Sequence, residues 1–282
     1  MLIAVASGKG GTGKTTVSVN VARALGAPVH VMDCDVEEPN GHLFLPGSVV
    51  EERIVAMPVP DVDESLCDGC AECGKFCEFN AIVSFGTVPL VYPEMCHGCG
   101  GCTRVCPRQA IREVDKRIGV VETLQSGDIT LIQGRLDVGM AMAPPLIRAV
   151  KALAPTGRTV IMDAPPGTSC PVIATLRGAD VVVLVTEPTP FGLHDLTLAV
   201  EMVRTLGLPF GVVVNRVGVG DDRVHRYCEG QGIPILLEIP DDRRIAEAYS
   251  RGELLVDALP EYCGLFKDLL ETTKTLAQAG AA

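Results

Sequence analysis

Short apolar runs alternate with amphipathic stretches through the first 60 residues and again after about residue 116. Helix-like segments lie between several of these runs, at Thr15–Leu25, Pro145–Leu153 and Leu193–Leu206. Continuous apolar strands that alternate with helices predict an α/β fold with a parallel sheet covered on both faces. The expected strands, rich in β-branched residues and bounded by Gly, Pro, Asp or Asn, are Leu2–Ala6, Val29–Met32, Ile54–Met57, Ile129–Ile132, Val160–Met162, Val181–Val185 and Gly211–Val214.

Residues 61–115 differ in composition from the rest of the chain and contain an internal repeat. They are rich in Cys, Gly, Asp and Glu, and they lack long apolar runs. Seven residues recur at an offset of 29, where Cys67, Gly69, Cys70, Cys73, Cys77, Ala81 and Ile82 return as Cys96, Gly98, Cys99, Cys102, Cys106, Ala110 and Ile111. Because loops tolerate long insertions, we predict a pseudo-twofold α+β domain at 61–115, inserted into an α/β domain formed by residues 1–60 and 116–282.

Composition narrows the classes of function. A net charge of -11 disfavours binding to nucleic acid, and the scarcity of aromatic residues, at 4% with no Trp, disfavours stacking on bases. No run of 18 or more apolar residues exists, and Met1–Ala6 leads into glycines and a lysine rather than a signal-peptide cleavage site. We therefore expect a cytoplasmic protein with no stable membrane anchor.

The cysteines indicate metal ligation. Eight of the twelve fall between Cys67 and Cys106, and each half of the repeat has the spacing Cys-x-x-Cys-x-x-Cys-x-x-x-Cys of bacterial ferredoxins. In such runs three cysteines bind one 4Fe–4S cluster and the fourth binds the other. Structural zinc is the alternative, but paired zinc sites usually separate two Cys-x-x-Cys pairs by a longer loop. The two predicted ligand sets are Cys67, Cys70, Cys73 and Cys106 for one cluster, and Cys96, Cys99, Cys102 and Cys77 for the other.

A phosphate-binding loop follows the first predicted strand and opens the first helix. Its glycines let the backbone wrap a phosphate, while Lys14 would reach the β- and γ-phosphates and the Thr15 hydroxyl would ligate Mg²⁺. A glycine-rich turn without a ligand is the alternative interpretation. The expected phosphate cradle comprises Gly8, Lys9, Gly10, Gly11, Thr12, Gly13, Lys14, Thr15 and Thr16.

The additional lysine, Lys9, gives the loop the pattern Lys-Gly-Gly-x-Gly-Lys-Thr. This resembles the deviant Walker A loop of the MinD/Mrp/ParA superfamily, a SIMIBI-type group of P-loop ATPases that includes the nitrogenase iron protein. The resemblance implies that ATP and Mg²⁺ bind here. It also implies that Lys9 crosses a dimer interface to the partner's nucleotide, so that hydrolysis requires two subunits.

Three further stretches resemble the same superfamily. Asp33–Asn40 is similar to switch I, which implies that Asp35 orients or activates the attacking water, with Asp33 near the metal and Asn40 near the nucleotide. The segment 161–167 is similar to the Walker B and switch II region, which implies that Asp163 holds Mg²⁺ and that Gly167 contacts the γ-phosphate. The ends of two later strands resemble the adenine site and place Asn215, Arg216, Pro240 and Asp241 beside the base.

The whole pattern resembles MinD-superfamily ATPases with an inserted two-cluster ferredoxin domain. Lys9, Lys14 and Asp35 are the expected catalytic residues of a dimer, formed with a second copy or with a related ATPase. We expect ATP to drive electron transfer from the clusters to a redox partner or a metallocofactor-maturation protein. The alternatives are a carrier or assembly ATPase for iron–sulfur or other metal clusters, and a redox-sensing regulatory ATPase. By comparison with the nitrogenase iron protein, Cys170 is either a metal ligand at the dimer axis or a buried packing residue.

Overall fold

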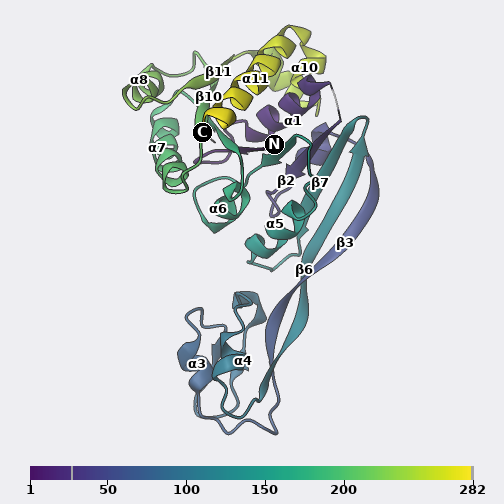
Figure 1. Ribbon diagram of the computed structural model, residues 1–282, viewed down its shortest axis with the longest axis vertical. Coiled ribbons are helices and arrows are strands. Elements are labelled where there is room, and N and C mark those ends of the chain that lie inside the picture. Colours follow the sequence, from purple (N-terminus) through teal and green to yellow (C-terminus); the bar gives the residue numbers. More distant parts are fainter. Residues whose placement is uncertain (27, 281–282) are drawn as a thin grey trace.

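A nine-stranded sheet forms the body of the protein in the computed structural model, which describes residues 1–26 and 28–280. The pairings from β11 to β7 are parallel, and those of β7 with β6 and of β6 with β3 are antiparallel. The predicted α/β body with a parallel sheet is therefore confirmed, with an antiparallel edge (Figure 1). In spatial order the strands are β11 (Ile235–Pro240), β10 (Phe210–Val217), β9 (Val181–Thr186), β1 (Leu2–Ala6), β8 (Val160–Asp163), β2 (Val29–Asp33), β7 (Ile129–Leu136), β6 (Ile111–Ser126) and β3 (Ser48–Val62).

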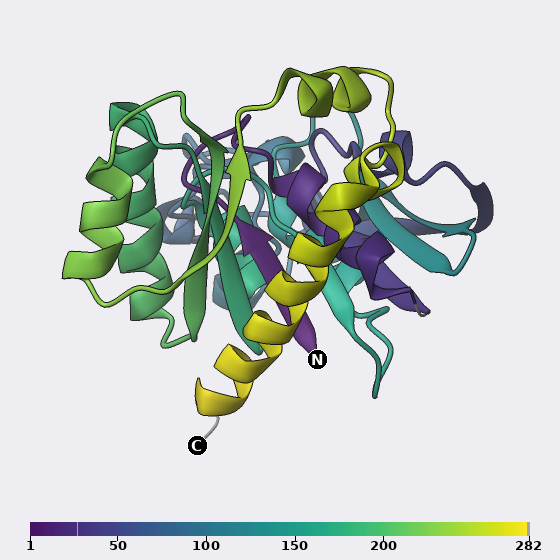
Figure 2. The ribbon, with the colours of Figure 1, turned by 90° about the horizontal axis from the view of Figure 1, so that it is seen from above.

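Helices cover both faces of the sheet because the strands are apolar on both sides. In β1, Ile3 and Val5 pack with one face, while Ala4 and Ala6 pack with the other. The first face carries α1 (Lys14–Leu25), α10 (Leu255–Ala258) and α11 (Cys263–Gly280), and α11 crosses the sheet beside α1 in Figure 2. The second face carries α5 (Ala143–Lys151), α6 (Cys170–Leu176), α7 (Pro190–Thr205) and α8 (Arg223–Gly230). Two shorter helices, α2 (Gly41–Phe44) and α9 (Arg243–Ser250), follow β2 and β11.

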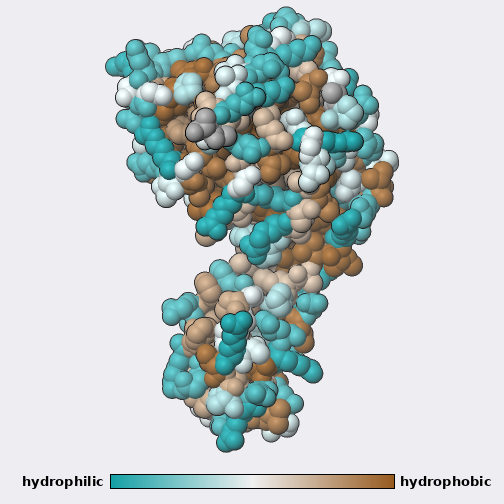
Figure 3. Space-filling model, viewed as in Figure 1, coloured by the Kyte–Doolittle hydropathy of each residue, from teal (hydrophilic) through white to brown (hydrophobic). Residues whose placement is uncertain are grey.

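None of the helices in the described chain is long and apolar enough to cross a bilayer. Hydrophilic residues dominate the visible surface, and apolar residues show among them on both parts of the molecule (Figure 3).

The prediction that Ile54–Met57 is a buried strand of the parallel sheet is wrong. These residues belong to β3, an edge strand that pairs only with β6 and is antiparallel to it. Ile54 is 64% exposed and follows the exposed charged residues Glu51, Glu52 and Arg53, although Met57 at the end of the run is buried. An apolar run of four residues does not reveal whether a helix will cover it.

The strands β3 and β6 pair continuously as far as Val62 and Ile111, and together they form a stalk that leaves the body (Figure 1). At its end lies the cysteine module, residues 63–110, with α3 (Glu72–Phe76), β4 (Ile82–Val83), β5 (Leu90–Val91) and α4 (Gly101–Val105). The strands thus run through both predicted boundaries of the insert, at 60/61 and 115/116.

The offset of 29 seen in the sequence extends to the backbone of the cysteine module. The helices α3 and α4 occupy equivalent positions in the two halves. Left-handed residues also recur in pairs, Gly69 with Gly98, Ala71 with Gly100, and Asn80 with Gln109. Equivalent residues Ile82 and Ile111 fill a small core together with the buried Cys73. The module therefore has two similar halves that pack on each other.

Candidate functional site

The phosphate-binding loop connects β1 to α1. Gly13 caps the helix with φ 95°, and Gly11 has φ 78°, conformations that only glycine adopts without strain. Lys14, the first residue of α1, is buried. The Oγ1 atom of Thr12 is also buried and has no hydrogen-bond partner among the described residues. The loop thus presents a helix N-terminus, a buried cation and an unpartnered hydroxyl, a donor set that fits an anionic phosphate.

Two buried carboxylates lie beneath this loop at the carboxyl ends of β2 and β8. Asp163 accepts hydrogen bonds from Thr15 Oγ1 at 2.6 Å and from Ser18 Oγ at 3.1 Å. Asp33 accepts hydrogen bonds from the backbone N–H groups of Asp35, Asn40 and Gly41, at 2.9 to 3.1 Å. Oxygen ligands of this kind suit Mg²⁺.

The carboxylates of this site are held in a low-dielectric environment. Burial, with a further contribution from the charge of Asp163, raises the pKa of Asp33 to about 7. Burial likewise raises the pKa of Asp163 and raises that of Asp35 to about 6, against the opposing charge of Lys14. The charge of one of these carboxylates affects the ionisation of the other, so Asp33 and Asp163 titrate as a pair and share any proton that is bound there. A divalent cation would remove the electrostatic cost of ionising both.

A cavity of about 470 Å³ opens above the loop and is large enough for a small-molecule ligand. Predicted residues that line it are Gly10, Gly11, Gly13, Lys14, Thr15, Thr16, Asp35, Asn40, Asn215, Arg216, Pro240 and Asp241. Asn215 donates from Nδ2 to the carbonyl of Thr12 at 2.9 Å, which ties the end of β10 to the loop. The other predicted residues of the nucleotide and Mg²⁺ site lie outside this lining, namely Gly8, Lys9, Thr12, Asp33, Asp163 and Gly167.

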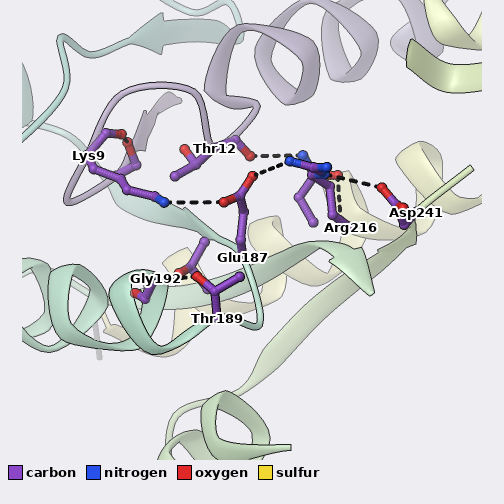
Figure 4. A network of polar contacts seen from close by, with 10 residues as sticks. Lys9, Thr12, Glu187, Thr189, Gly192, Arg216 and Asp241 are labelled. Carbon is purple, nitrogen blue, oxygen red and sulfur yellow. Dashed lines mark hydrogen bonds and ion pairs between the residues drawn. The ribbon is translucent and has the colours of Figure 1, made fainter. Parts of the chain in front are cut away.

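Lys9 belongs to a polar network beside this cavity (Figure 4). Its ammonium group lies 3.3 Å from Glu187, which follows β9 and whose side chain is only 10% exposed. Glu187 also pairs with Arg216 at 3.3 Å, and Arg216 pairs with Asp241 at 3.2 Å. Within one chain, then, Lys9 is held by its own Glu187 rather than extended away from the loop.

Two observations at switch II bear on the predictions. The Gly167 N–H donates to the carbonyl of Ser7 at 3.0 Å, so in this conformation it is not directed at a nucleotide. Cys170 begins α6 and is exposed, so its interpretation as a buried packing residue is wrong.

The eight clustered cysteines separate into two groups of four, each around its own cavity. Site A comprises Cys67, Cys70, Cys73 and Cys106, and site B comprises Cys77, Cys96, Cys99 and Cys102. These are the two ligand sets predicted from the spacing. Backbone N–H groups already point at two of the sulfurs, Gly98 to Cys96 at 3.4 Å and Ala110 to Cys106 at 3.3 Å. Four thiols with N–H donors around one space suit a cubane cluster.

Site A encloses about 10 Å³ and site B about 460 Å³. The two groups of thiols thus border spaces of very different size, and the larger cavity of site B extends beyond its four cysteines. In the part of the chain that the structure describes, no three His, Cys, Asp or Glu side chains are placed to hold a single metal ion.

Residues 3–256 match the family described as the CobQ/CobB/MinD/ParA nucleotide binding domain. The chain belongs to this family. The resemblance inferred from the loop and switch segments is thereby confirmed for the body of the protein, which is a P-loop nucleotide-binding fold.

Several related proteins align with nearly the whole length of this chain. Two proteins of Methanocaldococcus jannaschii are each 31% identical, one over 90% of both chains and the other over 97% of this chain and 96% of its own. An iron-sulfur cluster carrier protein of Aquifex aeolicus is 26% identical over 98% of this chain and 67% of its own. The septum site-determining protein MinD of Pyrococcus horikoshii, solved with Mg-ADP, covers 99% of this chain and 98% of its own, with a TM-score of 0.61 and 22% identity.

Several residues of the candidate nucleotide site in this chain were not predicted. Ser18 lies one turn after Thr15 on α1, and the helical period of the sequence could have identified it. Ile245, Ala246 and Tyr249 line the cavity from α9, which follows the strand end at Pro240 and Asp241 but was not included in the prediction. Glu187 is a single glutamate after an apolar strand, and no pattern distinguishes it.

Proposed function

We propose that this protein is a dimeric ATPase that couples ATP binding and hydrolysis to electron transfer from two 4Fe–4S clusters. The acceptor would be a partner protein or a maturing metallocofactor. The observation that carries the coupling is a continuous set of contacts from switch I to the stalk. The sequence pattern and the arrangement of thiols in sites A and B support the clusters.

Switch I reaches the stalk through three contacts. Val36, which follows Asp35, is buried and accepts a hydrogen bond from the Leu136 N–H at 2.8 Å, at the end of β7. The next residue, Asp137, donates its N–H to the Ile118 carbonyl of β6 at 2.9 Å. Its carboxylate accepts hydrogen bonds from Arg117 of β6 at 2.8 and 3.2 Å. A displacement of Asp35 by nucleotide is therefore transmitted to β6, which enters the cysteine module.

Hydrolysis would use the residues at the carboxyl ends of the strands. Lys14 would neutralise phosphate charge, Thr15 and Asp163 would hold Mg²⁺, and Asp35 would orient the water that forms the new P–O bond as the bond to ADP breaks. Asp35 is suited to this position because it is half-buried, lines the cavity and has a pKa raised to about 6. Lys9 would reach a partner's nucleotide once Glu187 releases it.

Sites A and B would hold the clusters through their four thiolates each. When bound, the clusters accept and release single electrons. The chain itself supplies the backbone N–H groups at Gly98 and Ala110, whose hydrogen bonds to sulfur stabilise the more negative, reduced state.

The test compares nucleotide effects on the reduced clusters under anaerobic conditions. The EPR signals and the rate of reoxidation by a small chemical acceptor are measured with and without Mg·ATP. We expect a nucleotide effect in the wild type, none in Lys14→Ala, and a weakened one in Asp137→Asn. Asp61→Asn is the matched control, because it breaks a similar exposed pair with Arg112 on the stalk, outside the path from switch I. Wild-type clusters that do not respond to ATP would refute the coupling.

A carrier function is the second candidate, favoured by relatives whose names describe iron-sulfur cluster carrier proteins. The same preparations distinguish the two. A carrier would transfer iron to an apo-ferredoxin offered as acceptor and would lose its own absorption in parallel. An electron-transfer protein would retain its iron over repeated cycles of reduction and reoxidation.

A further inference from the structure

Sites A and B are equivalent by the internal repeat, but their linings differ, and one pair of side chains shows this clearly. At site A, Asp68 and Arg108 form an ion pair at 2.8 Å, and both line the cavity. The residues 29 positions away from this pair are His97 and Phe79, which line site B. Their rings are stacked, with centroids 3.6 Å apart and planes 9° apart. An ion pair at one site is therefore replaced by two aromatic rings at the other.

The mouth of site B is apolar and accessible. Phe76 and Phe79 are 48% and 41% exposed, and Cys99, one of the four thiols, is exposed beside them. The position of Phe76 is fixed by its packing on Gly101, since a methyl group there would collide with the ring. Exposed aromatic residues next to a deep cavity are typical of the centre of a protein interface.

Two carboxylates border this apolar mouth. Glu78 and Glu113 line site B, and neither has an ion-pair partner within the described residues. Four other acidic residues near the cysteine module form ion pairs within the chain, whereas Asp63, Glu64 and Asp115 lie outside site B. These pairs are Asp61 with Arg112, Asp68 with Arg108, Glu72 with Lys75, and Glu94 with Lys116. Glu78 and Glu113 therefore leave unneutralised negative charge at the mouth of site B.

We propose that the mouth of site B is the docking surface for a redox protein with basic residues around an apolar, electron-accepting edge. This inference rests on the proposed electron-transfer function and identifies the side of the module on which the partner binds. Phe76 and Phe79 form the apolar centre of the surface, and Glu78 and Glu113 form its charged rim. Opposite charges at the rim speed the encounter and orient the partner, while apolar contact brings it close to the exposed Cys99.

Binding is measured with oxidised cytochrome c, a basic protein with an exposed haem edge, as the probe. Both proteins are kept oxidised, so calorimetry reports association without electron transfer. We expect Glu78→Gln/Glu113→Gln to weaken binding roughly fivefold and to reduce its dependence on salt, as two exposed charge pairs would. Phe79→Ser is expected to weaken binding with the salt dependence unchanged.

The matched control is Glu52→Gln/Glu64→Gln, which removes the same charge from exposed positions outside site B. Equal weakening by both double variants would overturn the proposal in favour of a general effect of net charge. An unchanged affinity in the site B variants would overturn it directly. If Phe79→Ser altered the sedimentation of the protein alone, a second copy of this chain would be the occupant, and the proposal would fail.

The EPR response to Mg·ATP tests the coupling independently of the docking surface. We expect Glu78→Gln/Glu113→Gln to retain the wild-type response, because neither residue contributes to the contacts between switch I and the stalk. Normal probe binding together with no response to ATP in any protein would refute the coupling and leave the docking surface intact.

Discussion

Replacing Asp33 by Asn tests whether the nucleotide site stores an electrostatic penalty that Mg²⁺ relieves. Asp33 is fully buried beside Asp163, and three backbone N–H groups point at its carboxylate. The N–H groups favour the charged form, whereas burial and Asp163 oppose it, and the opposing effects are larger because the pKa rises to about 7. Asn keeps the shape of the side chain and removes its charge.

The pKa shift sets the direction and size of the effect. A carboxyl whose pKa is about 3.8 when unfolded and about 7 when folded binds its proton more tightly in the folded chain. The associated stability is present below the unfolded pKa and is lost as the pH rises through 7. By this reasoning, the raised pKa of the pair makes the free energy of unfolding lower than at acidic pH, by of order 4 kcal/mol at pH 8 and by of order 1 to 2 kcal/mol at pH 5.

The Asn variant loses part of the hydrogen bonding, because its amide can accept from the N–H groups with one oxygen only. That loss is about 1 kcal/mol and does not depend on pH. We therefore expect Asp33→Asn to match the wild type at pH 5 and to exceed its stability by about 3 kcal/mol at pH 8.

Urea unfolding in EDTA, without nucleotide and under anaerobic conditions, measures both proteins at the two pH values. Addition of Mg·ADP at pH 8 should narrow the gap by stabilising the wild type more strongly. A variant that is less stable than the wild type by the same amount at pH 5 and pH 8 would show that the carboxylate carries no such penalty. Equal stabilisation of both proteins by Mg·ADP would refute its role near the metal.

Three further outcomes follow from the same geometry. Glu187→Gln removes the charge that pairs with Lys9 and Arg216, and it should lower the free energy of unfolding by only about 1 kcal/mol because both cations are partly exposed to solvent. The same change should release Lys9 and so favour the ATP-bound dimer, which sedimentation measures. Gly13→Ala should abolish nucleotide binding measured by calorimetry, since φ is 95° and the new methyl group collides with the Asn215 amide. In the cluster-free chain at pH 8, mass spectrometry should show iodoacetamide labelling exposed Cys170 well before Cys34 and Cys228. Burial raises the pKa of both of these thiols, that of Cys228 to about 11.

Local patterns in the sequence point to the residues that surround the candidate nucleotide cavity, because most of them lie at the ends of apolar strands. The glycines of the loop, Thr15 and Asp163 each follow a strand of the parallel sheet, and parallel strands place their carboxyl ends at one edge. The same logic cannot find Glu187, since its role depends on the pairing of β9 with β1 and on the position of Lys9. Tyr249 lies on a helix after the last strand and reaches the cavity only through the tertiary fold.

The stalk is the part of the fold that could not be predicted from the sequence. The repeat at an offset of 29 predicts two similar halves, but it carries no information on how they join the body. That depends on β3 and β6, whose pairing extends from Ser48 opposite Gln125 to Val62 opposite Ile111. A two-stranded ribbon is only marginally stable alone. The stalk is therefore held at the body by the pairing of β6 with β7, and at its far end by the core of the cysteine module. Because β6 takes part in both, a shift of switch I that moved Asp137 would act on the strand that enters the module, and this is the route on which the proposed coupling depends.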